Sequence, residues 1–287
     1  MKTSTEIGSI AMNVGEEKAV ELVGKAGFDA WDFSMLKMAD YDWQTNSVQI
    51  IPHPLNQSQY LKFARELRKI GEAYGMVCNQ SHAPFPTDRI PIDWMKRSIE
   101  CTAEAGGTIC VIHPHNLASA EENAEFYGSL LPFAKEHGVK IATENMWDWK
   151  YGAKTSCFAA CATSEDFVKH IDLVNDPYFV ACLDIGHAEM RGSGSGAANM
   201  IRALGYRLQA LHIHDNDLLN DNHQIPFSMN IDFAEIAKAL KEINYTGFLT
   251  LEAISFITGN EDSELLFSRV RQLLESVKRV DLLISES

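Results

Sequence analysis

The chain has 287 residues, of which 46% are hydrophobic and 22% are charged. This composition is typical of a globular protein and excludes a disordered or fibrous one, and the length suits one large domain. Asp and Glu outnumber Lys and Arg by 39 to 25, which gives a formal net charge of −14. Such a charge repels nucleic acid phosphates and anionic membranes, and no basic cluster offsets it, so neither partner is expected.

The sequence contains no signal for secretion or membrane insertion. Residues 1–6 lack a basic region followed by an apolar core, and no apolar stretch approaches the length of a membrane span. The six cysteines are scattered, without the spacing of a zinc ribbon or the density of a disulfide-rich scaffold. The simplest interpretation is a reduced, cytoplasmic protein.

Short apolar runs alternate with longer amphipathic stretches along the chain, a pattern that predicts parallel strands joined by helices. The predicted strands are 7–11, 30–33, 77–81, 108–112, 140–143, 179–183, 208–213 and 248–251. The predicted helices are 16–26, 57–74, 93–105, 120–137, 165–174, 197–204, 232–243 and 263–283. This regular alternation predicts an α/β fold, a single (β/α)₈ TIM barrel domain over residues 1–287, rather than an open sheet.

Histidine and carboxylate side chains follow the last six predicted strands. In a (β/α)₈ barrel the functional groups come from the C-terminal ends of the strands, which closure brings into one ring. The residues at these ends include His82, His113, Glu144, Asp184, His187, His212 and Glu252. Side chains far apart in the sequence are therefore expected to converge on one cavity.

Four of these residues form the predicted metal site. Glu144, Asp184, His212 and Glu252 supply mixed oxygen and nitrogen ligation, which suits Mn²⁺, Mg²⁺, Co²⁺, Fe²⁺ or Zn²⁺. Converging carboxylates also need a cation to offset their charge. We therefore predict one divalent metal ion as cofactor, against the alternative of a structural network in which these groups pair with one another.

Motifs in the second half of the chain carry a resemblance to a known superfamily. They are Asp184–His187, Leu211–Asn216, Asp221–His223, Ile231–Phe233 and Gly247–Glu252. The sequence resembles the xylose isomerase-like barrel superfamily, closely over residues 140–253. The first half is similar more loosely, through residues 27–30 and 81–84.

The resemblance implies both an activity and residue roles. In sugar isomerases and ketose epimerases of this superfamily, the positions matching Glu144, Asp184, His212 and Glu252 hold one divalent metal. The metal polarises a carbonyl and the adjacent hydroxyl, and the catalytic residues, matched by Glu144 and Glu252, remove and return a proton through an enediolate. The position matching His187 contacts the substrate, although His187 could instead support Asp184.

Further residues are assigned to a sugar or sugar phosphate substrate. The predicted substrate-binding residues are His82, His113, His187, Asp221, His223 and Trp147. The connection after Glu144 also carries Trp149 and Tyr151, and its aromatic rings either form a lid over the sugar carbons or pack the loop onto the barrel rim.

The strongest alternative is a metal-dependent endonuclease of the same superfamily that cuts DNA at abasic sites. These nucleases bind three zinc ions, and the matching positions here are His82, His113, Glu144, Asp184, His187, His212, Asp221, His223 and Glu252. The net charge of −14 argues against DNA binding. A keto-inositol dehydratase-like lyase and a non-catalytic sugar-binding barrel are further alternatives. A homo-oligomer is compatible with such a barrel, but no surface patch identifies an interface.

Overall fold

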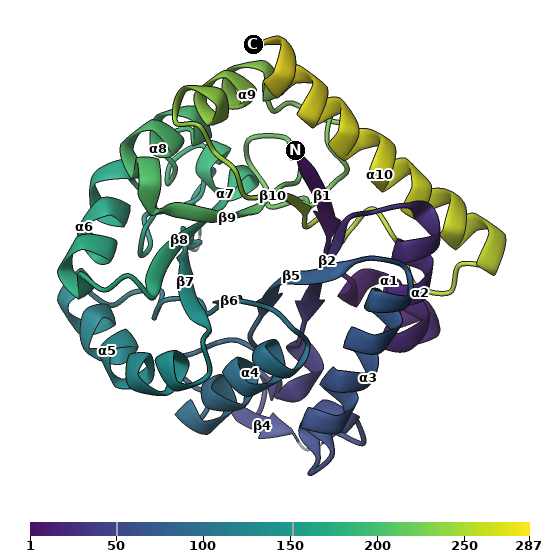
Figure 1. The fold of residues 1–287 in the computed structure, drawn as a ribbon. Coiled ribbons are helices and arrows are strands. Elements are labelled where there is room, and N and C mark those ends of the chain that lie inside the picture. The colour runs from purple at the N-terminus through teal and green to yellow at the C-terminus, as the bar shows by residue number, and fades with distance from the viewer. Residues whose placement is uncertain (50, 151) are drawn as a thin grey trace.

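The computed structural model describes residues 1–49, 51–150 and 152–287, so Tyr151 of the predicted aromatic loop lies outside the described residues. Within these residues, eight parallel strands form a ring (Figure 1). The barrel strands are β1 (Lys2–Thr5), β2 (Ala30–Ser34), β5 (Val77–His82), β6 (Ile109–Val111), β7 (Lys140–Glu144), β8 (Phe179–Asp184), β9 (Leu208–His212) and β10 (Phe248–Leu251).

The ring of strands is closed by two short parallel bridges. Strands β2, β5, β6, β7, β8 and β9 pair in that order, and β1 pairs with β10. A bridge between Glu6 and Asp32 joins β1 to β2, and a bridge between Ile213 and Leu251 joins β9 to β10. The predicted (β/α)₈ barrel is therefore confirmed.

Helices surround the strands, as Figure 1 shows. The outer layer consists of α2 (Glu16–Ala26), α3 (Tyr60–Ala73), α4 (Ile92–Glu104), α5 (Ala120–Glu136), α6 (Ser164–Val174), α8 (Ala197–Leu204), α9 (Phe233–Glu242) and α10 (Ser263–Glu286). Shorter elements are the helices α1 (Gly8–Val14) and α7 (Ile185–Glu189) and the 3₁₀ turns η1 (Leu36–Met38), η2 (Pro54–Asn56) and η3 (Gly205–Arg207). The apolar faces of the outer helices pack on the barrel and form the core.

The prediction of a first strand at residues 7–11 is wrong. That segment belongs largely to helix α1, and the strand is Lys2–Thr5. The apolar residues Ile7, Ile10 and Ala11 are spaced three and four apart, which suits one face of a helix rather than a strand. The real strand has no apolar run, because its buried residues are threonines and a serine.

The barrel interior next to β1 is polar, which explains this composition. The Ser4 hydroxyl donates to Oδ1 of Asn79 over 2.6 Å, and Nδ2 of Asn79 donates to the Thr250 hydroxyl over 3.0 Å. Because Ser4 and Asn79 lie on strands separated by β2, their contact crosses the inside of the barrel. Small hydroxyl side chains therefore fill this part of the interior and satisfy their hydrogen bonds there.

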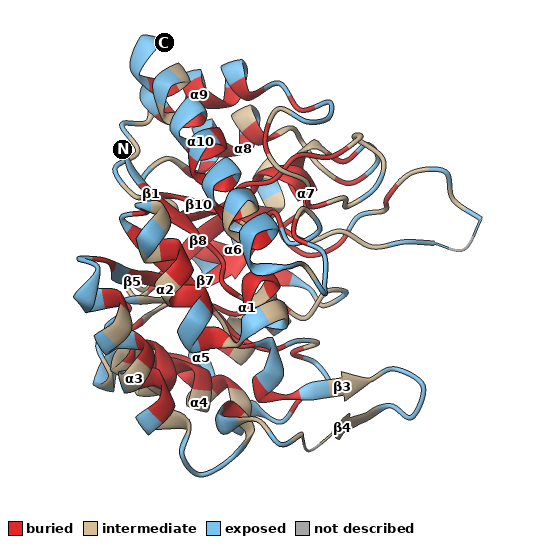
Figure 2. Ribbon diagram, turned by 90° about the vertical axis from the view of Figure 1, so that its right-hand side faces the viewer, coloured by how far each residue is buried: buried red, intermediate tan, exposed pale blue. Residues whose placement is uncertain are grey.

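A hairpin extends the molecule beyond the carboxyl ends of the strands. Strands β3 (Asp40–Asp42) and β4 (Ser47–Gln49) pair antiparallel, and Figure 2 shows them projecting on the same side as α7, which directly follows β8. All six cysteines lie in described parts of the chain and are free thiols. No helix among the described residues combines the length and apolar character needed to cross a membrane.

Candidate functional site

The carboxyl ends of the strands surround a cavity of about 740 Å³. Eight of the predicted site residues line it: His82, His113, Glu144, Trp147, His187, Asp221, His223 and Glu252. The other two, Asp184 and His212, are fully buried next to it. The structure thus brings all the predicted site residues to one end of the barrel, because each follows or ends a strand or lies in a loop at that end.

The four predicted metal ligands converge. Glu144, Asp184 and His212 end β7, β8 and β9, and Glu252 directly follows β10. The parallel register places Asp184 beside His212. One potential ligand atom from each of the four lies within 4.8 Å of the others, so the group is compact enough to hold one metal ion.

Asp184 has one satisfied oxygen and one free oxygen. Its Oδ1 accepts from the backbone N–H of His187 over 2.6 Å, which caps helix α7, and lies 3.1 Å from Nε2 of His214. Its Oδ2 is buried and has no hydrogen-bond partner in the described structure. A buried carboxylate oxygen without a partner is costly unless a cation or proton satisfies it, so this atom fits a metal ligand.

The motif Asp184–His187 requires its glycine. A Cβ atom on Gly186 would lie 1.9 Å from Cε1 of His214, so any other residue would displace that ring. The His214 ring packed there reaches Asp184 through Nε2. The glycine therefore allows a close approach of β8 and β9 just past their ends, and this approach orients the Asp184 carboxylate.

His212 faces carboxylates through both ring nitrogens. Its Nδ1 lies 3.1 Å from Oε2 of Glu144 and 3.6 Å from Oε2 of Glu252. Its Nε2 lies 3.4 Å from Oδ2 of Asp32 without forming a hydrogen bond, and that oxygen accepts from Nε2 of Gln80 over 2.9 Å. With Nδ1 as the metal ligand, Asp32 would orient the ring from the other side, as carboxylates commonly do behind metal-binding histidines.

Glu144 and His212 shift each other's pKa. Burial opposes its ionisation, but neighbouring His212, His113 and His82 outweigh this effect and hold the pKa of its carboxyl well below the usual value. Burial disfavours the charged form of His212 as well, yet Cys182, Glu252 and Glu144 raise its pKa well above the usual value. The charged forms of the carboxylate and the imidazole therefore stabilise each other.

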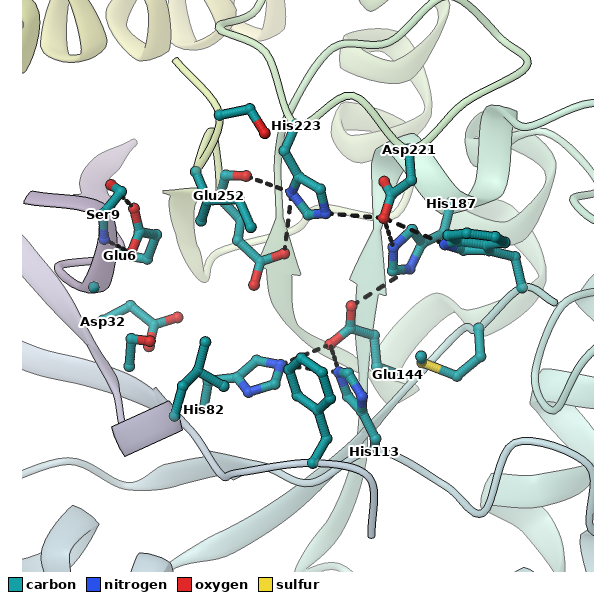
Figure 3. A pocket seen from close by; sticks show the side chains of 18 of the residues that line it. Glu6, Ser9, Asp32, His82, His113, Glu144, His187, Asp221, His223 and Glu252 are labelled. Carbon is teal, nitrogen blue, oxygen red and sulfur yellow. Dashed lines mark hydrogen bonds and ion pairs between the residues drawn. The ribbon is translucent and has the colours of Figure 1, made fainter. Parts of the chain in front are cut away.

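Two further groups of His and carboxylate side chains flank the four predicted metal ligands, which we call the central group. His82 and His113 adjoin it through Glu144, whose Oε2 lies 3.7 Å and 3.4 Å from their Nε2 atoms. On the other side, His187 and His223 meet at Asp221, at 3.2 Å and 3.0 Å from its Oδ2 (Figure 3). His214 completes this group. Each flanking group could hold a further cation, and the assignment of its residues to substrate stays a prediction.

His187 is held in one orientation. Its Nδ1 donates to the backbone oxygen of Asn145 over 2.9 Å, so its Nε2 points to Asp221. Burial lowers the pKa of His187, but the carboxylates of Asp184 and Asp221 outweigh burial and raise it well above the usual value. Both ring nitrogens therefore face acceptors, and a substrate oxygen would have to take the place of Asp221 at Nε2 to accept a hydrogen bond from this ring.

The aromatic loop after Glu144 lies at the mouth of the cavity. Nε1 of Trp147 donates to Oδ2 of Asp221 over 3.3 Å, so this ring is tied to the group around Asp221. Trp149 also lines the cavity and is 44% exposed. Both positions suit contact with a substrate as well as packing on the rim, and the two interpretations of the loop stay open.

Four carboxylates that line the cavity were not among the predicted site residues: Glu6, Glu16, Asp32 and Asp148. Glu6 and Asp32 lie together on the opposite side of the cavity from Glu144 and His187 (Figure 3). Glu6 follows the real first strand, so the misplaced strand at 7–11 concealed it. Asp32 lies inside predicted strand 30–33, where an acidic residue between Trp31 and Phe33 was the available signal.

Glu6 differs electrostatically from the carboxylates of the metal group. Burial raises the pKa of its carboxyl from 4.5 to about 7, although hydrogen bonds from the backbone and hydroxyl of Ser9 act in the opposite direction. A carboxyl group of this kind exchanges protons near neutral pH, which is a common property of acid and base groups in active sites.

A family model described as a xylose isomerase-like TIM barrel matches residues 20–276. An uncharacterised protein of Methanocaldococcus jannaschii is 23% identical over 252 residues, which cover 81% of this chain and 82% of that protein. These matches extend over most of the barrel.

Solved structures show the same fold over the full length. A D-tagatose 3-epimerase-like protein superposes with a TM-score of 0.72 at 20% identity, covering 100% of this chain and 99% of that one. A D-psicose 3-epimerase, solved in the presence of D-fructose, superposes with a TM-score of 0.70 at 15% identity, covering 98% and 99%. At these identities the likeness establishes the shared fold.

Proposed function

Because the chain belongs to the xylose isomerase-like TIM barrel family, we propose that it is a divalent-metal-dependent isomerase or epimerase acting on a sugar. The observation that carries the proposal is the convergence of Glu144, Asp184, His212 and Glu252 at the cavity. Sugar epimerases among the structural neighbours support the substrate class.

A metal ion suits these four residues because the buried Oδ2 of Asp184 lacks a partner and the carboxylates crowd around His212. A divalent cation held there would polarise a substrate carbonyl and stabilise the negative charge that develops on its oxygen. The residues that would hold it are those of the central group, with Asp32 orienting His212.

Glu144 and Glu252 are assigned the proton transfer. Their Oε2 atoms both approach Nδ1 of His212, so the two carboxylates lie next to the same ligand position. One removes the proton from the carbon beside the carbonyl and the other returns it to the opposite face or the neighbouring carbon. Glu252 has the more accessible side chain, 15% against 1% exposed, and we assign the first proton removal to it.

Deuterium exchange tests this proposal directly. The Mn²⁺-loaded protein, incubated in D₂O with a panel of ketoses, should incorporate deuterium at the carbon next to the carbonyl. Glu252→Gln keeps the side-chain volume but removes the base, so it should lower the exchange rate by roughly 10²–10⁴-fold. Glu275→Gln, on the exposed face of α10, is the matched control and should exchange at the wild-type rate. Full activity of Glu252→Gln would falsify the assigned role.

The abasic-site endonuclease stays the second candidate, because the flanking groups around His113 and Asp221 could also hold cations. The charge of the cavity disfavours it, since Lys37 is the sole Lys or Arg among the described lining residues. Metal analysis should find about one tightly bound ion per chain. Three zinc ions, together with cleavage of an abasic oligonucleotide, would favour the nuclease.

A keto-inositol dehydratase begins with the same proton removal and then expels water. Mass analysis of the products separates the two reactions, because an isomerase or epimerase leaves the substrate mass unchanged. Loss of one water from the product would replace the isomerase proposal by the lyase.

A further inference from the structure

The cavity has an outer part that differs from its inner part. The inner part consists of the His and carboxylate groups, whereas large apolar side chains surround the opening. These residues, which we call the apolar collar, are Met12, Leu36, Trp43, Phe85, Trp149 and Ile254. Every one of them is at least 36% exposed, and Met12 and Trp43 reach 61%. Apolar groups gathered at the opening of a binding cavity mark a contact surface for a ligand.

The collar is continuous with the inner part of the cavity. The Phe85 ring stacks on His113, with centroids 5.2 Å apart and planes inclined by 19°. The ring of Trp149 lies edge to face with Trp147, 6.4 Å away, and Trp147 donates to Asp221. A ligand that is bound by the inner groups and extends toward the opening would therefore contact the rings of Phe85 and Trp149.

Trp43 adds the β3–β4 hairpin to the residues of the collar. It lies in the turn of the β3–β4 hairpin, which projects beyond the strand ends (Figure 2). The Tyr41 ring supports it edge to face at 5.1 Å, and the Arg89 guanidinium lies 6.0 Å from its centroid. Contacts of this kind hold the indole in place, and Trp43 is still 61% exposed for contact with a ligand.

The charge of the cavity excludes a phosphate clamp among the described residues. Lys37, which is exposed, is the sole Lys or Arg among the described lining residues. Seven acidic side chains line the cavity: Glu6, Glu16, Asp32, Glu144, Asp148, Asp221 and Glu252. Phosphate recognition generally uses Arg, Lys or helix N-termini that offset its charge. The lining therefore favours an uncharged substrate.

The volume points to a ligand larger than one sugar ring. The cavity holds about 740 Å³, in the upper part of the roughly 300–1,000 Å³ range of pockets for drug-sized ligands. A single hexose in the inner part would leave the collar uncovered. Rings of a second sugar or an aryl group present the flat apolar faces that stack on Trp and Phe.

We propose, on the basis of the proposed function, that the substrate is an unphosphorylated keto sugar joined through a glycosidic bond to a second uncharged ring. The keto sugar occupies the inner part of the cavity beside Glu144 and Glu252, and the second ring lies on the collar against Trp43 and Trp149. The collar faces the same cavity as the catalytic groups, which favours the outer half of the substrate as its occupant over a partner protein.

Three probes separate the possibilities: fructose, the disaccharide isomaltulose (a glucosyl fructose) and fructose 6-phosphate. Deuterium exchange and binding by calorimetry are measured for each with the Mn²⁺-loaded protein. We expect kcat/KM for exchange and affinity to be highest for isomaltulose and lowest for fructose 6-phosphate. The double variant Trp43→Ala/Trp149→Ala should lower the preference for isomaltulose over fructose by about tenfold.

Tyr206→Ala is the matched control, because Tyr206 is an exposed aromatic residue in η3, which precedes β9 at the opposite end of the barrel. It should leave the preference unchanged. Preference for fructose 6-phosphate, equal affinity for both neutral sugars, or a preference that survives the double variant would overturn the proposal. A change in the mass of the double variant in sedimentation, without loss of preference, would also overturn it and identify the collar as a contact between copies.

Failure of the proposed function gives a different result. Tighter binding of isomaltulose than fructose, lost in the double variant but without exchange in any sugar, would support the two-ring site and reject the isomerase chemistry. Exchange in fructose with no advantage for isomaltulose would keep the chemistry and reject the site on the collar.

Discussion

The two sides of the cavity present buried carboxylates in different surroundings. Glu144 ends β7 and Glu6 follows β1, and each is at most 5% exposed. Imidazoles from His212, His113 and His82 outweigh the burial of Glu144 and lower its pKa, whereas burial dominates at Glu6 and raises its pKa to about 7. Position at a strand end therefore does not determine the charge of a carboxylate; its neighbours do.

The cavity therefore has two sides whose carboxyl groups differ in pKa. On the side around Glu144, the pKa values of Glu144, Asp184 and Asp221 are lowered, which suits a cation, whereas burial raises the pKa of Glu6 to about 7. Asp32 links the two sides, because it lies beside Glu6 in the cavity and its Oδ2 approaches Nε2 of His212. Substitutions at His212, Glu6 and Asp32 test this division in turn.

The largest effect is expected at His212. His212→Gln keeps a polar side chain but removes the imidazole between Glu144 and Glu252, so metal affinity should fall by more than the roughly 10–100-fold typical of losing an outer partner. Exchange activity should be lost with the metal. Metal content after dialysis and the Mn²⁺ dependence of thermal unfolding measure the change.

Wild-type protein provides the reference for this substitution. Mn²⁺ at a thousandfold excess over its dissociation constant should stabilise the wild type by about 4 kcal/mol, and His212→Gln should show little of this at the same concentration. Equal stabilisation of both proteins would place the metal elsewhere and remove the basis for the contrast between the two sides.

Glu6 should make stability depend on pH in the opposite sense to an ordinary salt-bridged carboxylate. Its pKa is raised by burial from 4.5 to about 7, so the folded state binds more protons than the unfolded state between these values. Its contribution to stability is therefore complete below about pH 4.5 and is lost as pH rises through 7. The loss amounts to at most roughly 3 kcal/mol.

Glu6→Gln removes this dependence, because its amide does not ionise. Relative to the wild type, the variant should gain stability between pH 5 and pH 8 in urea unfolding of the metal-free protein. Glu275→Gln on the surface of α10 should show no such trend. A difference between wild type and Glu6→Gln that stays constant over this pH range would contradict the raised pKa.

A smaller effect is expected at Asp32, which acts through His212. Asp32→Asn replaces the carboxylate that faces Nε2 of His212 by a neutral amide, so the ring is held less firmly. We expect metal affinity to fall by roughly 10–100-fold, with the metal-free protein melting near the wild-type temperature. Titration with Mn²⁺ followed by calorimetry gives the affinity.

Asp29→Asn is the matched control at the other end of β2. Asp29 accepts hydrogen bonds from the backbone and hydroxyl of Thr3, at 2.8 Å and 2.9 Å, and, unlike Asp32, it does not line the cavity. Its substitution should lower the melting temperature and leave metal affinity intact. If Asp29→Asn and Asp32→Asn weakened metal binding equally, the effect would reflect general loosening of the strand rather than orientation of His212.

Prediction from sequence worked best where a strand is apolar and ends abruptly in polar residues. Strands β7 to β10 have this pattern, and their predicted ends differ from the observed ones by no more than one residue. The same pattern located Glu144, Asp184, His212 and Glu252. Prediction failed at β1, because its Thr and Ser residues face a polar interior and provide no hydrophobic signal.

The sequence by itself determined the (β/α)₈ barrel and the set of residues at the ends of its second-half strands, because both depend on local alternation of apolar and polar segments. Tertiary structure alone decided that Glu6 and Asp32 face this set across the cavity, and that Trp43 from a distant hairpin borders the same opening. These relations arise from closure of the barrel and the path of its loops, and residues that meet only through closure leave no periodic pattern in the chain.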